Sequence, residues 1–482
     1  MGKIQFGTDG WRAVISEDFT FDNVKIVAQA VADYIKNQKS KIKNKKSEIY
    51  GKKIEMVVGY DTRFLSEKYA ELVALVFAAN GIKVILTDRP TPTPSVSFYI
   101  RHNNLIGGVM ITASHNPARY NGIKYKGYFG GSVGSLITDK IESNLYKSKL
   151  KYMENDEAVR KGLLRIENII PIHTENVKKY VDMNLLRSAN LKILVDSMNG
   201  AGAALFEEIL KNTNNKVTTI NGNRDVYFGG RSPEPNEVQL ESTSEIVRKG
   251  DYDVAIVTDG DSDRLGVILK NGKVVSGHKI ITLLLLHLLE DRKMKGGVVQ
   301  TICGTSLINK IAEKYNFKTY ETAVGFKYIS EIMLKEDILV GGEETGGIAF
   351  KGWVPERDAL LSGLLMLEMI IHRKKNLMDI LDDIDKEYGT FIYKRYDKNL
   401  PKEEKKKLLA FLKKKPFKEV LGRKIIDIKD YDGFKFVRDD GSWFMLRPSG
   451  TEPKLRIYSE SPSESEAIKL IEFARKVVEE CK

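Results

Sequence analysis

Three aspartates alternate in the segment TDGDSDR (258–264), directly after an apolar run. In an extended loop every second side chain can turn toward one point, and three carboxylates at one point repel one another unless a cation lies among them. Oxygen ligands favour Mg²⁺, Ca²⁺ or Mn²⁺ over zinc. Asp259, Asp261 and Asp263 are therefore candidate ligands of a hard divalent cation.

Other interpretations of this segment make specific demands. An EF-hand loop needs Gly at its sixth position and Glu at its twelfth, where this sequence has Arg264 and Lys270. A phosphatase with an aspartyl nucleophile usually carries Thr or Val four residues after that aspartate, and here the position is Asp263. A solvated acidic turn stays open as the alternative to a metal site.

Ser114 and His115 stand together in TASHNP (112–117), which raises the possibility of a hydrolase nucleophile with its base. The G-x-S-x-G pattern of a nucleophile elbow is absent, and adjacent side chains tend to point apart. For His115 we therefore favour a supporting role in the catalytic site, in which it shapes the loop by hydrogen bonding, over the role of a base. Ser114 is better suited to carry a phosphoryl group. A phosphoserine would supply a further ligand to a cation held by the aspartates, and Lys124 could approach the same group.

Two further segments combine glycine with polar side chains. In RPSGTEPKLR (447–456), hydroxyls, backbone N–H groups and guanidinium groups together could hold a phosphate. The residues that supply these groups are Arg447, Ser449, Gly450, Thr451 and Arg456. An ordinary hairpin turn is the alternative. In GGEETGG (341–347), Glu343 and Thr345 share one side of a glycine-rich turn, which suits sugar hydroxyls.

The elements that must position these residues alternate between short β-branched runs and longer helical patterns, which indicates α/β units. We expect strands over 54–61, 82–88 and 105–113 and a helix over 66–80. Each polar cluster follows a strand, and ligands gather at the carboxyl ends of parallel strands. The similar segments VVGYDTR, ILVDSMNG and VVQTICGT hint at repeated α/β domains.

Bulk composition limits the function classes. The 482 residues are 42% hydrophobic and 29% charged, which predicts three or four globular domains. Much of the net charge of +12 lies in 36–53 and 401–418, where aromatics do not interleave in the way a stacking surface would, so we expect solvated segments and no nucleic-acid partner. Cys303 and Cys481 form no disulfide or zinc pattern, which fits the cytoplasm.

The apolar stretches are too short for a membrane. Residues 280–289 and 360–371 fall short of about 20 residues and include His287 and Glu368, so we expect buried helices and no membrane partner. The N-terminal residues also lack the apolar core of a signal peptide.

Four motifs in order, TASHNP, DGDSDR, GGEETGG and RPSGTEPKLR, resemble those of the α-D-phosphohexomutases, most closely the phosphoglucomutase/phosphomannomutases. FGTDGWR (6–12) adds a fifth, and together they span the chain. The resemblance implies a four-domain phosphohexomutase architecture around a central cleft, with three similar α/β domains and a smaller C-terminal α+β domain. The expected domains are 1–155, 156–272, 273–380 and 385–482.

The resemblance also implies roles for individual residues. Ser114 matches the phosphoserine, and Asp259, Asp261 and Asp263 match the Mg²⁺ ligands. Glu343 and Thr345 match the sugar-binding loop, where the family more often has Ser at the second position. The residues that match the loop for the phosphate not being transferred are Arg447, Ser449, Gly450, Thr451 and Arg456. Those that match polar groups lining the cleft are Arg12, Lys124, Arg264 and Lys327.

The implied reaction interconverts hexose 1-phosphate and hexose 6-phosphate, of glucose, mannose or both, through a hexose 1,6-bisphosphate that also serves as activator. We expect Lys124 to be the general acid/base and Arg264 to stabilise charge. A phosphoglucosamine mutase and a sugar-1,6-bisphosphate synthase are the alternatives on the same scaffold. We expect hexose phosphates as partners and a monomer or homodimer. A nucleic-acid-binding protein would leave the aspartates unexplained.

Overall fold

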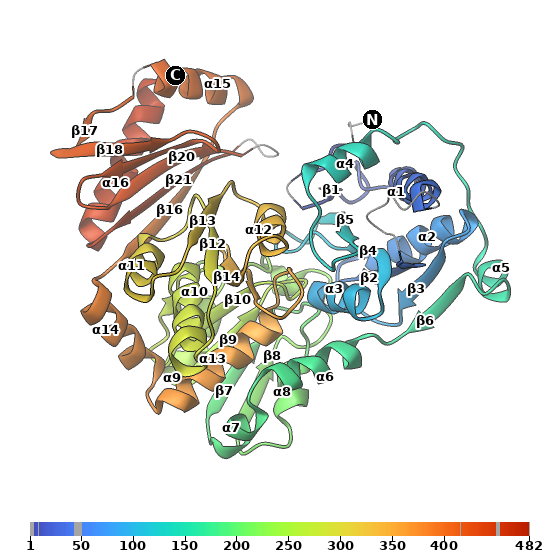
Figure 1. Ribbon diagram of the computed structural model, residues 1–482, viewed down its shortest axis with the longest axis horizontal. Coiled ribbons are helices and arrows are strands. Elements are labelled where there is room, and N and C mark those ends of the chain that lie inside the picture. The colour runs from blue at the N-terminus through green and yellow to red at the C-terminus, as the bar shows by residue number, and fades with distance from the viewer. Residues whose placement is uncertain (1–3, 8, 43–50, 415, 450–453, 482) are drawn as a thin grey trace.

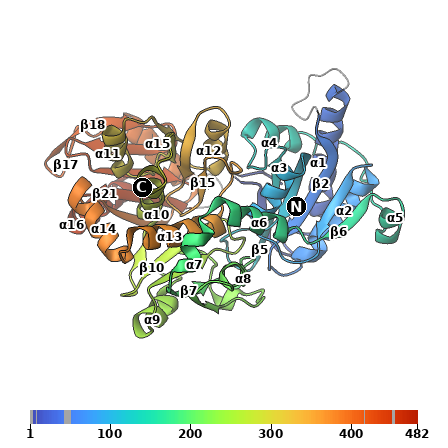
Figure 2. The same cartoon turned by 60° about the horizontal axis from the view of Figure 1, so that its bottom comes forward.

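The chain folds into four parts, each built on its own β-sheet (Figure 1). The computed structural model describes residues 4–7, 9–42, 51–414, 416–449 and 454–481. The first and fourth sheets lie at opposite sides of the molecule in both views, and the strands of the second sheet lie toward the bottom (Figures 1 and 2). Three mixed α/β parts and a C-terminal antiparallel part confirm the predicted fold class.

The first sheet has six strands in the order β1-β5-β4-β2-β3-β6. Its strands are β1 (Trp11–Val14), β2 (Lys53–Tyr60), β3 (Lys83–Thr87), β4 (Leu105–Ile111), β5 (Tyr120–Gly127) and β6 (Leu164–Glu167). Its helices are α1 (Phe21–Ile42), α2 (Ser66–Ala79), α3 (Thr93–His102), α4 (Ser135–Glu142) and α5 (Asn155–Arg160). Strand β6 pairs with β3, so this sheet extends past residue 155, where the sequence placed the end of the first domain.

The second sheet has the order β11-β10-β9-β7-β8. Its strands are β7 (Lys192–Asp196), β8 (Lys216–Ile220), β9 (Val254–Thr258), β10 (Leu265–Leu269) and β11 (Val274–Val275). The helices in this part of the chain are α6 (Ile170–Tyr180), α7 (Met183–Ser188), α8 (Leu205–Leu210), the short η1 (Phe228–Gly230) and α9 (Glu241–Lys249).

The third sheet has the order β13-β12-β14-β15. Its strands are β12 (Gly297–Thr301), β13 (Thr319–Thr322), β14 (Ile338–Gly342) and β15 (Ile348–Phe350). Its helices are α10 (Gly277–Leu286), continued by the π-helical η2 (His287–Asp291), then α11 (Ser306–Tyr315), α12 (Phe326–Met333), α13 (Ala359–Arg373) and α14 (Leu377–Tyr388).

A four-strand unit recurs in these three sheets. In each, a central strand (β2, β7 or β12) pairs in parallel with the next two strands of the unit, and the second of these pairs with an antiparallel fourth strand. The three similar sequence segments each cover the C-terminal end of one central strand and the turn after it, so the repeat hinted at by the sequence is confirmed. The turns β4–β5, β9–β10 and β14–β15 are therefore structurally equivalent.

The second and third sheets share one hydrophobic core, to which α10 and α13 contribute most of their apolar side chains. Helix α13 begins after Asp358, whose carboxylate accepts the N–H of Leu361 at 3.0 Å and caps the helix. The two apolar stretches singled out in the sequence are thus buried helices, as predicted. In the described part of the chain no helix is long and apolar enough to cross a membrane.

The fourth part is an antiparallel sheet in the order β16-β21-β20-β19-β18-β17, with its own core. Its strands are β16 (Ile392–Asn399), β17 (Glu419–Val420), β18 (Arg423–Lys429), β19 (Phe434–Arg438), β20 (Trp443–Pro448) and β21 (Lys454–Ser461). Its helices are α15 (Lys402–Lys414) and α16 (Glu464–Glu480). Cys303 packs with Trp443 and Met445 in a small apolar cluster that joins this part to the third.

Candidate active site

The three equivalent turns carry the predicted chemistry and meet one another. Ser114 lies in the β4–β5 turn, the three aspartates in the β9–β10 turn, and Glu343 in the β14–β15 turn. The Ser114 hydroxyl donates to Asp259 Oδ2 at 3.0 Å, and Arg264 forms an isolated β-bridge with Gly347. A Cβ at Gly260 would lie 2.6 Å from the Ser114 carbonyl oxygen, so only glycine permits this approach of the two turns.

Ser114 is fully buried and adopts a left-handed backbone conformation, with φ at 52°. This conformation costs a residue with a Cβ about 1–2 kcal/mol, and it persists only where surrounding contacts enforce it. The Ser114 N–H donates to Thr112 Oγ1 at 2.8 Å. The turn therefore aims the hydroxyl at the aspartates at some conformational cost.

His115 lies beside this hydroxyl without the geometry of a strong base. Its Nδ1 is 3.4 Å from Ser114 Oγ, beyond the usual length of such a bond. Burial, followed by the positive charges of Arg264 and Arg12, lowers the pKa of His115 well below its usual range. The imidazole is therefore neutral at neutral pH.

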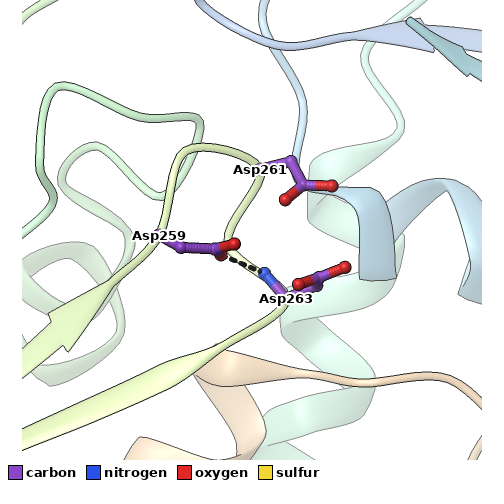
Figure 3. A group of neighbouring side chains, drawn as sticks. All are labelled: Asp259, Asp261 and Asp263. Carbon is purple, nitrogen blue, oxygen red and sulfur yellow. Dashed lines mark hydrogen bonds between the residues drawn. The ribbon is translucent and has the colours of Figure 1, made fainter. Parts of the chain in front are cut away.

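The three aspartates bring ligand oxygens within 4.8 Å of one another (Figure 3). Each has one oxygen fixed by the protein. Asp259 Oδ1 accepts the N–H groups of Asp263 and Arg264 at 2.9 and 3.1 Å, the first drawn in Figure 3. Asp261 Oδ2 accepts from Thr93 Oγ1 at 2.6 Å and Lys124 Nζ at 2.8 Å. Asp263 Oδ2 pairs with Arg357 at 2.8 Å.

The remaining oxygens fit a cation. Asp261 Oδ1 and Asp263 Oδ1 are buried and have no hydrogen-bond partner within the described residues, and Asp259 Oδ2 accepts only the Ser114 hydroxyl there. Burial, and then the charges of Asp263 and Asp261, raise the pKa of Asp259 well above its usual range. A divalent cation among these oxygens would relieve both the desolvation and the repulsion.

Lys124, on β5, is the main cation facing the aspartates. Its ammonium lies 2.8 Å from Asp261, 3.0 Å from Asp9 and 3.4 Å from Asp263. Burial alone would lower the pKa of Lys124, but these carboxylates outweigh burial and raise it. Lys124 therefore stays protonated at neutral pH. Its raised pKa suits a group that stabilises negative charge better than the general acid/base expected from the sequence.

The sugar-loop candidates lie beside the same cluster. Glu343 is buried, burial raises its pKa, and its carboxylate lies 3.4 Å from Arg357. Thr345 Oγ1 is buried with no partner in the described part of the chain. Arg264 Nε and Nη1 also lack hydrogen-bond partners there, with Nε 3.9 Å from Asp263. These groups leave donors and acceptors available to a polar ligand.

The other candidate residues surround this centre less directly. Arg12, on β1, donates to Asn116 Oδ1 at 2.7 Å, whereas Lys327, on α12, donates to Ser135 Oγ at 3.0 Å and not to the carboxylates. On the fourth sheet Arg447 and Arg456 are cross-strand neighbours, and Arg447 donates to Asp432 at 2.9 Å. Ser449 follows β20, while Gly450 and Thr451 lie outside the described residues.

Arg456 faces the centre closely enough for its charge to help lower the pKa of His115, after the larger effects of burial, Arg264 and Arg12. The fourth part of the chain thus contributes positive charge to the same region as the other three.

Three further residues of the centre were not singled out in the sequence. Asp9 accepts from Arg357 at 2.8 Å and so joins the first part of the chain to the third. Arg357 lies in no motif singled out in the sequence, and apart from the adjacent Glu356 it pairs with carboxylates distant in sequence. Arg63 is fully buried beneath the Ser114 turn. The run Asp-Thr-Arg directly after β2 was the only local signal for Arg63.

Comparison with known proteins matches four domain families along the chain. They are described as phosphoglucomutase/phosphomannomutase, alpha/beta/alpha domains I, II and III and C-terminal domain, and they match residues 3–151, 171–272, 276–388 and 398–477. A phosphoglucomutase/phosphomannomutase of Thermococcus kodakarensis is 31% identical over 100% of this chain and 99% of its own length.

Two more relatives match over nearly their full length. A phosphoglucosamine/phosphogalactosamine mutase of Sulfurisphaera tokodaii is 30% identical over 99% of this chain and 100% of its own. A crystal structure of a protein from Thermus thermophilus is 31% identical and superposes with a TM-score of 0.85 over 99% of each chain. The resemblance drawn from the motifs is confirmed: the chain belongs to the phosphoglucomutase/phosphomannomutase family of α-D-phosphohexomutases, which are intramolecular phosphotransferases.

Proposed function

We propose that this protein interconverts hexose 1-phosphate and hexose 6-phosphate, of glucose, mannose or both, with Ser114 as the phosphoryl carrier. The observation that supports this most directly is the 3.0 Å contact between Ser114 Oγ and Asp259 Oδ2. It joins two equivalent turns of separate sheets. A buried serine against three carboxylates, two of which have an oxygen without a partner in the described residues, suits a phosphoserine that shares a metal with them.

Asp259, Asp261 and Asp263 would hold Mg²⁺, with a phosphate oxygen on Ser114 as a further ligand. Bound there, Mg²⁺ would offset negative charge on the transferring phosphoryl group. Lys124 and Arg264 would add positive charge at the same place, Lys124 by its ammonium and Arg264 by its unpartnered guanidinium nitrogens. Neutral His115 would hydrogen-bond the turn without competing for the phosphoryl group.

In the proposed reaction the bond from Ser114 Oγ to phosphorus breaks while a hydroxyl oxygen of the hexose phosphate bonds to phosphorus. The hydroxyl loses its proton, and the freed Ser114 Oγ gains one, so that the serine hydroxyl is restored. The resulting 1,6-bisphosphate then returns its other phosphoryl group to Ser114. The hexose must therefore bind in two opposite orientations. The phosphate not being transferred would be held by Arg447, Ser449, Gly450, Thr451 and Arg456, with Arg12 and Lys327 lining the cleft.

The preference for neutral hexoses is supported by the sugar-loop contacts. Glu343 faces Arg357 and has a raised pKa, so it offers little unbalanced negative charge to the ammonium of an amino sugar. Thr345 offers a spare hydroxyl to a sugar hydroxyl. The names of the relatives include both glucose/mannose and glucosamine enzymes, so glucosamine phosphate is the competing substrate to be tested.

Two measurements test this proposal. Intact mass before and after incubation with glucose 1,6-bisphosphate and Mg²⁺ should show one added phosphoryl group, mapping to Ser114. Turnover of glucose, mannose and glucosamine 1-phosphates should then be faster for the neutral hexoses, with the bisphosphate acting as activator. Faster turnover of glucosamine 1-phosphate would contradict the substrate assignment. Net accumulation of bisphosphate would instead identify a sugar-bisphosphate synthase.

A further inference from the structure

We propose that Arg63 is a positioning residue for phosphoryl transfer, because its guanidinium group holds the backbone of the Ser114 turn in the conformation that faces the aspartates. Arg63 lies just past β2 and is fully buried. Within the described residues it hydrogen-bonds neither the hydroxyl of Ser114 nor a carboxylate of the metal-site aspartates. The hydrogen bonds of Arg63 therefore reach the reacting groups only through the turn, and its charge, which also acts on Asp261, is kept in the variant Arg63→Lys. This inference rests on the proposed role of Ser114.

Four of the N–H donors of Arg63 bond carbonyl oxygens of one short segment, residues 114–120. Nη2 donates to the carbonyl oxygens of Ser114 at 2.5 Å and Asn116 at 2.7 Å. Nη1 donates to those of Pro117 and Tyr120, both at 3.0 Å. A guanidinium group has five N–H donors in a rigid plane, and four of the five donors of Arg63 bond carbonyl oxygens of the turn.

The fifth donor anchors the arginine itself. Arg63 Nε donates to Asp61 Oδ2 at 3.0 Å, and Asp61 also accepts the hydroxyl of Thr112 at 2.6 Å. Thr112 in turn accepts the N–H of Ser114. The pair Asp61–Arg63 therefore holds the turn by hydrogen bonds on both sides of Ser114, through Thr112 before it and Asn116 after it. The left-handed backbone of Ser114 requires such support.

The second part of the chain braces this arrangement. Arg224 donates to the carbonyl oxygens of Thr62 and Arg63 at 3.1 and 3.2 Å, and the Arg63 guanidinium lies 4.8 Å from the ring centroid of Phe228. The part of the chain that supplies the three aspartates thus also fixes the base of Arg63. Arg63 links the position of the phosphoryl carrier to that of the metal loop.

The decisive variant is Arg63→Lys, which keeps a positive charge opposite Asp61 but cannot reach four carbonyls in one plane. We expect kcat to fall about 100-fold with KM within about threefold, since a misplacement near 1 Å costs about that much and the groups that bind the substrate are untouched. The rate of Ser114 phosphorylation by glucose 1,6-bisphosphate should fall by a similar factor. Hydrogen exchange over 112–120 should rise about tenfold, with 257–265 unchanged.

Arg438→Lys is the matched control. Arg438 is equally buried, on β19 of the fourth sheet, and its donors go to Ser442, Glu466 and Asp440. It should lose a comparable amount of thermal stability while keeping kcat within about twofold. A second variant, Asp61→Asn with Arg63→Gln, removes both buried charges together and should show the same loss of kcat.

Three results would overturn the inference: kcat within about threefold of the unsubstituted protein for Arg63→Lys, an equal loss for Arg438→Lys, or a loss confined to KM. Failure of the proposed function would look different. The unsubstituted protein would then neither accept a phosphoryl group on Ser114 nor turn over any hexose phosphate.

Discussion

Two buried charged clusters of this molecule are built from similar residue types but differ in how their charges are arranged. The proposed catalytic cluster comprises Ser114, Lys124, Asp259, Asp261, Asp263 and Arg264. The His287 network lies between η2 and α13 and comprises His287, Glu290, Asp291, Arg292, Glu368 and Arg373. In the His287 network, both oxygens of Glu368 are engaged: Oε1 by His287 at 3.1 Å and Arg292 at 3.4 Å, and Oε2 by the N–H of Asp182 at 2.8 Å.

The two clusters differ in the pairing of their carboxylates, although Arg292 Nη1 of the His287 network also lacks a partner within the described residues. Asp291 in the His287 network pairs with His287 at 2.8 Å and Arg373 at 2.9 Å, so opposite charges alternate. In the catalytic cluster three carboxylates face one another and two oxygens lack partners within the described residues. Buried charged side chains that are paired are compatible with a stable fold, whereas buried carboxylates that lack partners indicate a binding site. Substitutions in the two clusters should therefore separate activity from stability.

The largest effect is expected from Ser114→Ala. Without the hydroxyl no phosphoryl group can be carried, so mutase turnover should fall by roughly 10⁴-fold or more, measured with glucose 1-phosphate and added bisphosphate. Ser97→Ala is the control, because Ser97 is an equally buried serine of the same part of the chain whose hydroxyl has no partner in the described residues. Near-normal turnover by Ser114→Ala would contradict the carrier role.

Asp259→Asn should lose activity without losing stability. The amide keeps an oxygen for the N–H groups of Asp263 and Arg264 but removes one charge from a repelling set. We expect turnover to fall about 10²–10³-fold, and the melting temperature in a chelating buffer to stay equal or rise. A clear drop in that melting temperature would mean that the aspartates stabilise the metal-free fold.

The sequence predicted the aspartates because their signal is local: three carboxylates within five residues can hardly avoid one another in the folded chain, so a cation site is the natural interpretation. It predicted the equivalent strands β2, β7 and β12 for the same reason, since each apolar run breaks into a polar turn. It could not predict Arg63 or Arg357 because, apart from the neighbouring Asp61 and Glu356, their partners are carbonyls and carboxylates brought close only by the fold. Strand β6 was also missed, because its short, half-exposed run is fixed only by pairing with β3.

Glu368→Gln should have the reverse effect of Asp259→Asn. It removes a buried charge that faces both His287 and Arg292, so the free energy of unfolding should fall by about 3 kcal/mol, measured by denaturant titration. Turnover at a temperature where the variant is folded should stay within about twofold, because within the described chain the hydrogen bonds and ion pairs of the network reach no residue of the catalytic cluster. A large loss of turnover would show that the two clusters are coupled.

The smallest effect is a pH dependence that distinguishes two buried histidines. Burial would lower the pKa of His287, but hydrogen bonds to Asp291 and Glu368 outweigh burial and raise it. A raised pKa stabilises the fold below the unfolded value of about 6.5, and this stability is lost as pH rises through the folded-state pKa. The advantage of the unsubstituted protein over His287→Gln in melting temperature should therefore shrink as pH increases from about 5.5 to 8.5.

His278→Gln supplies the comparison of opposite sign. His278 bonds the carbonyl oxygen of Cys303 at 2.8 Å, and burial lowers its pKa. A histidine whose folded pKa is lowered must give up its proton to fold, so its contribution is present above the unfolded pKa and is lost as pH falls below about 6.5. The two differences should thus change in opposite directions across the same buffers. Parallel changes would show that the carboxylates beside His287 do not hold its proton.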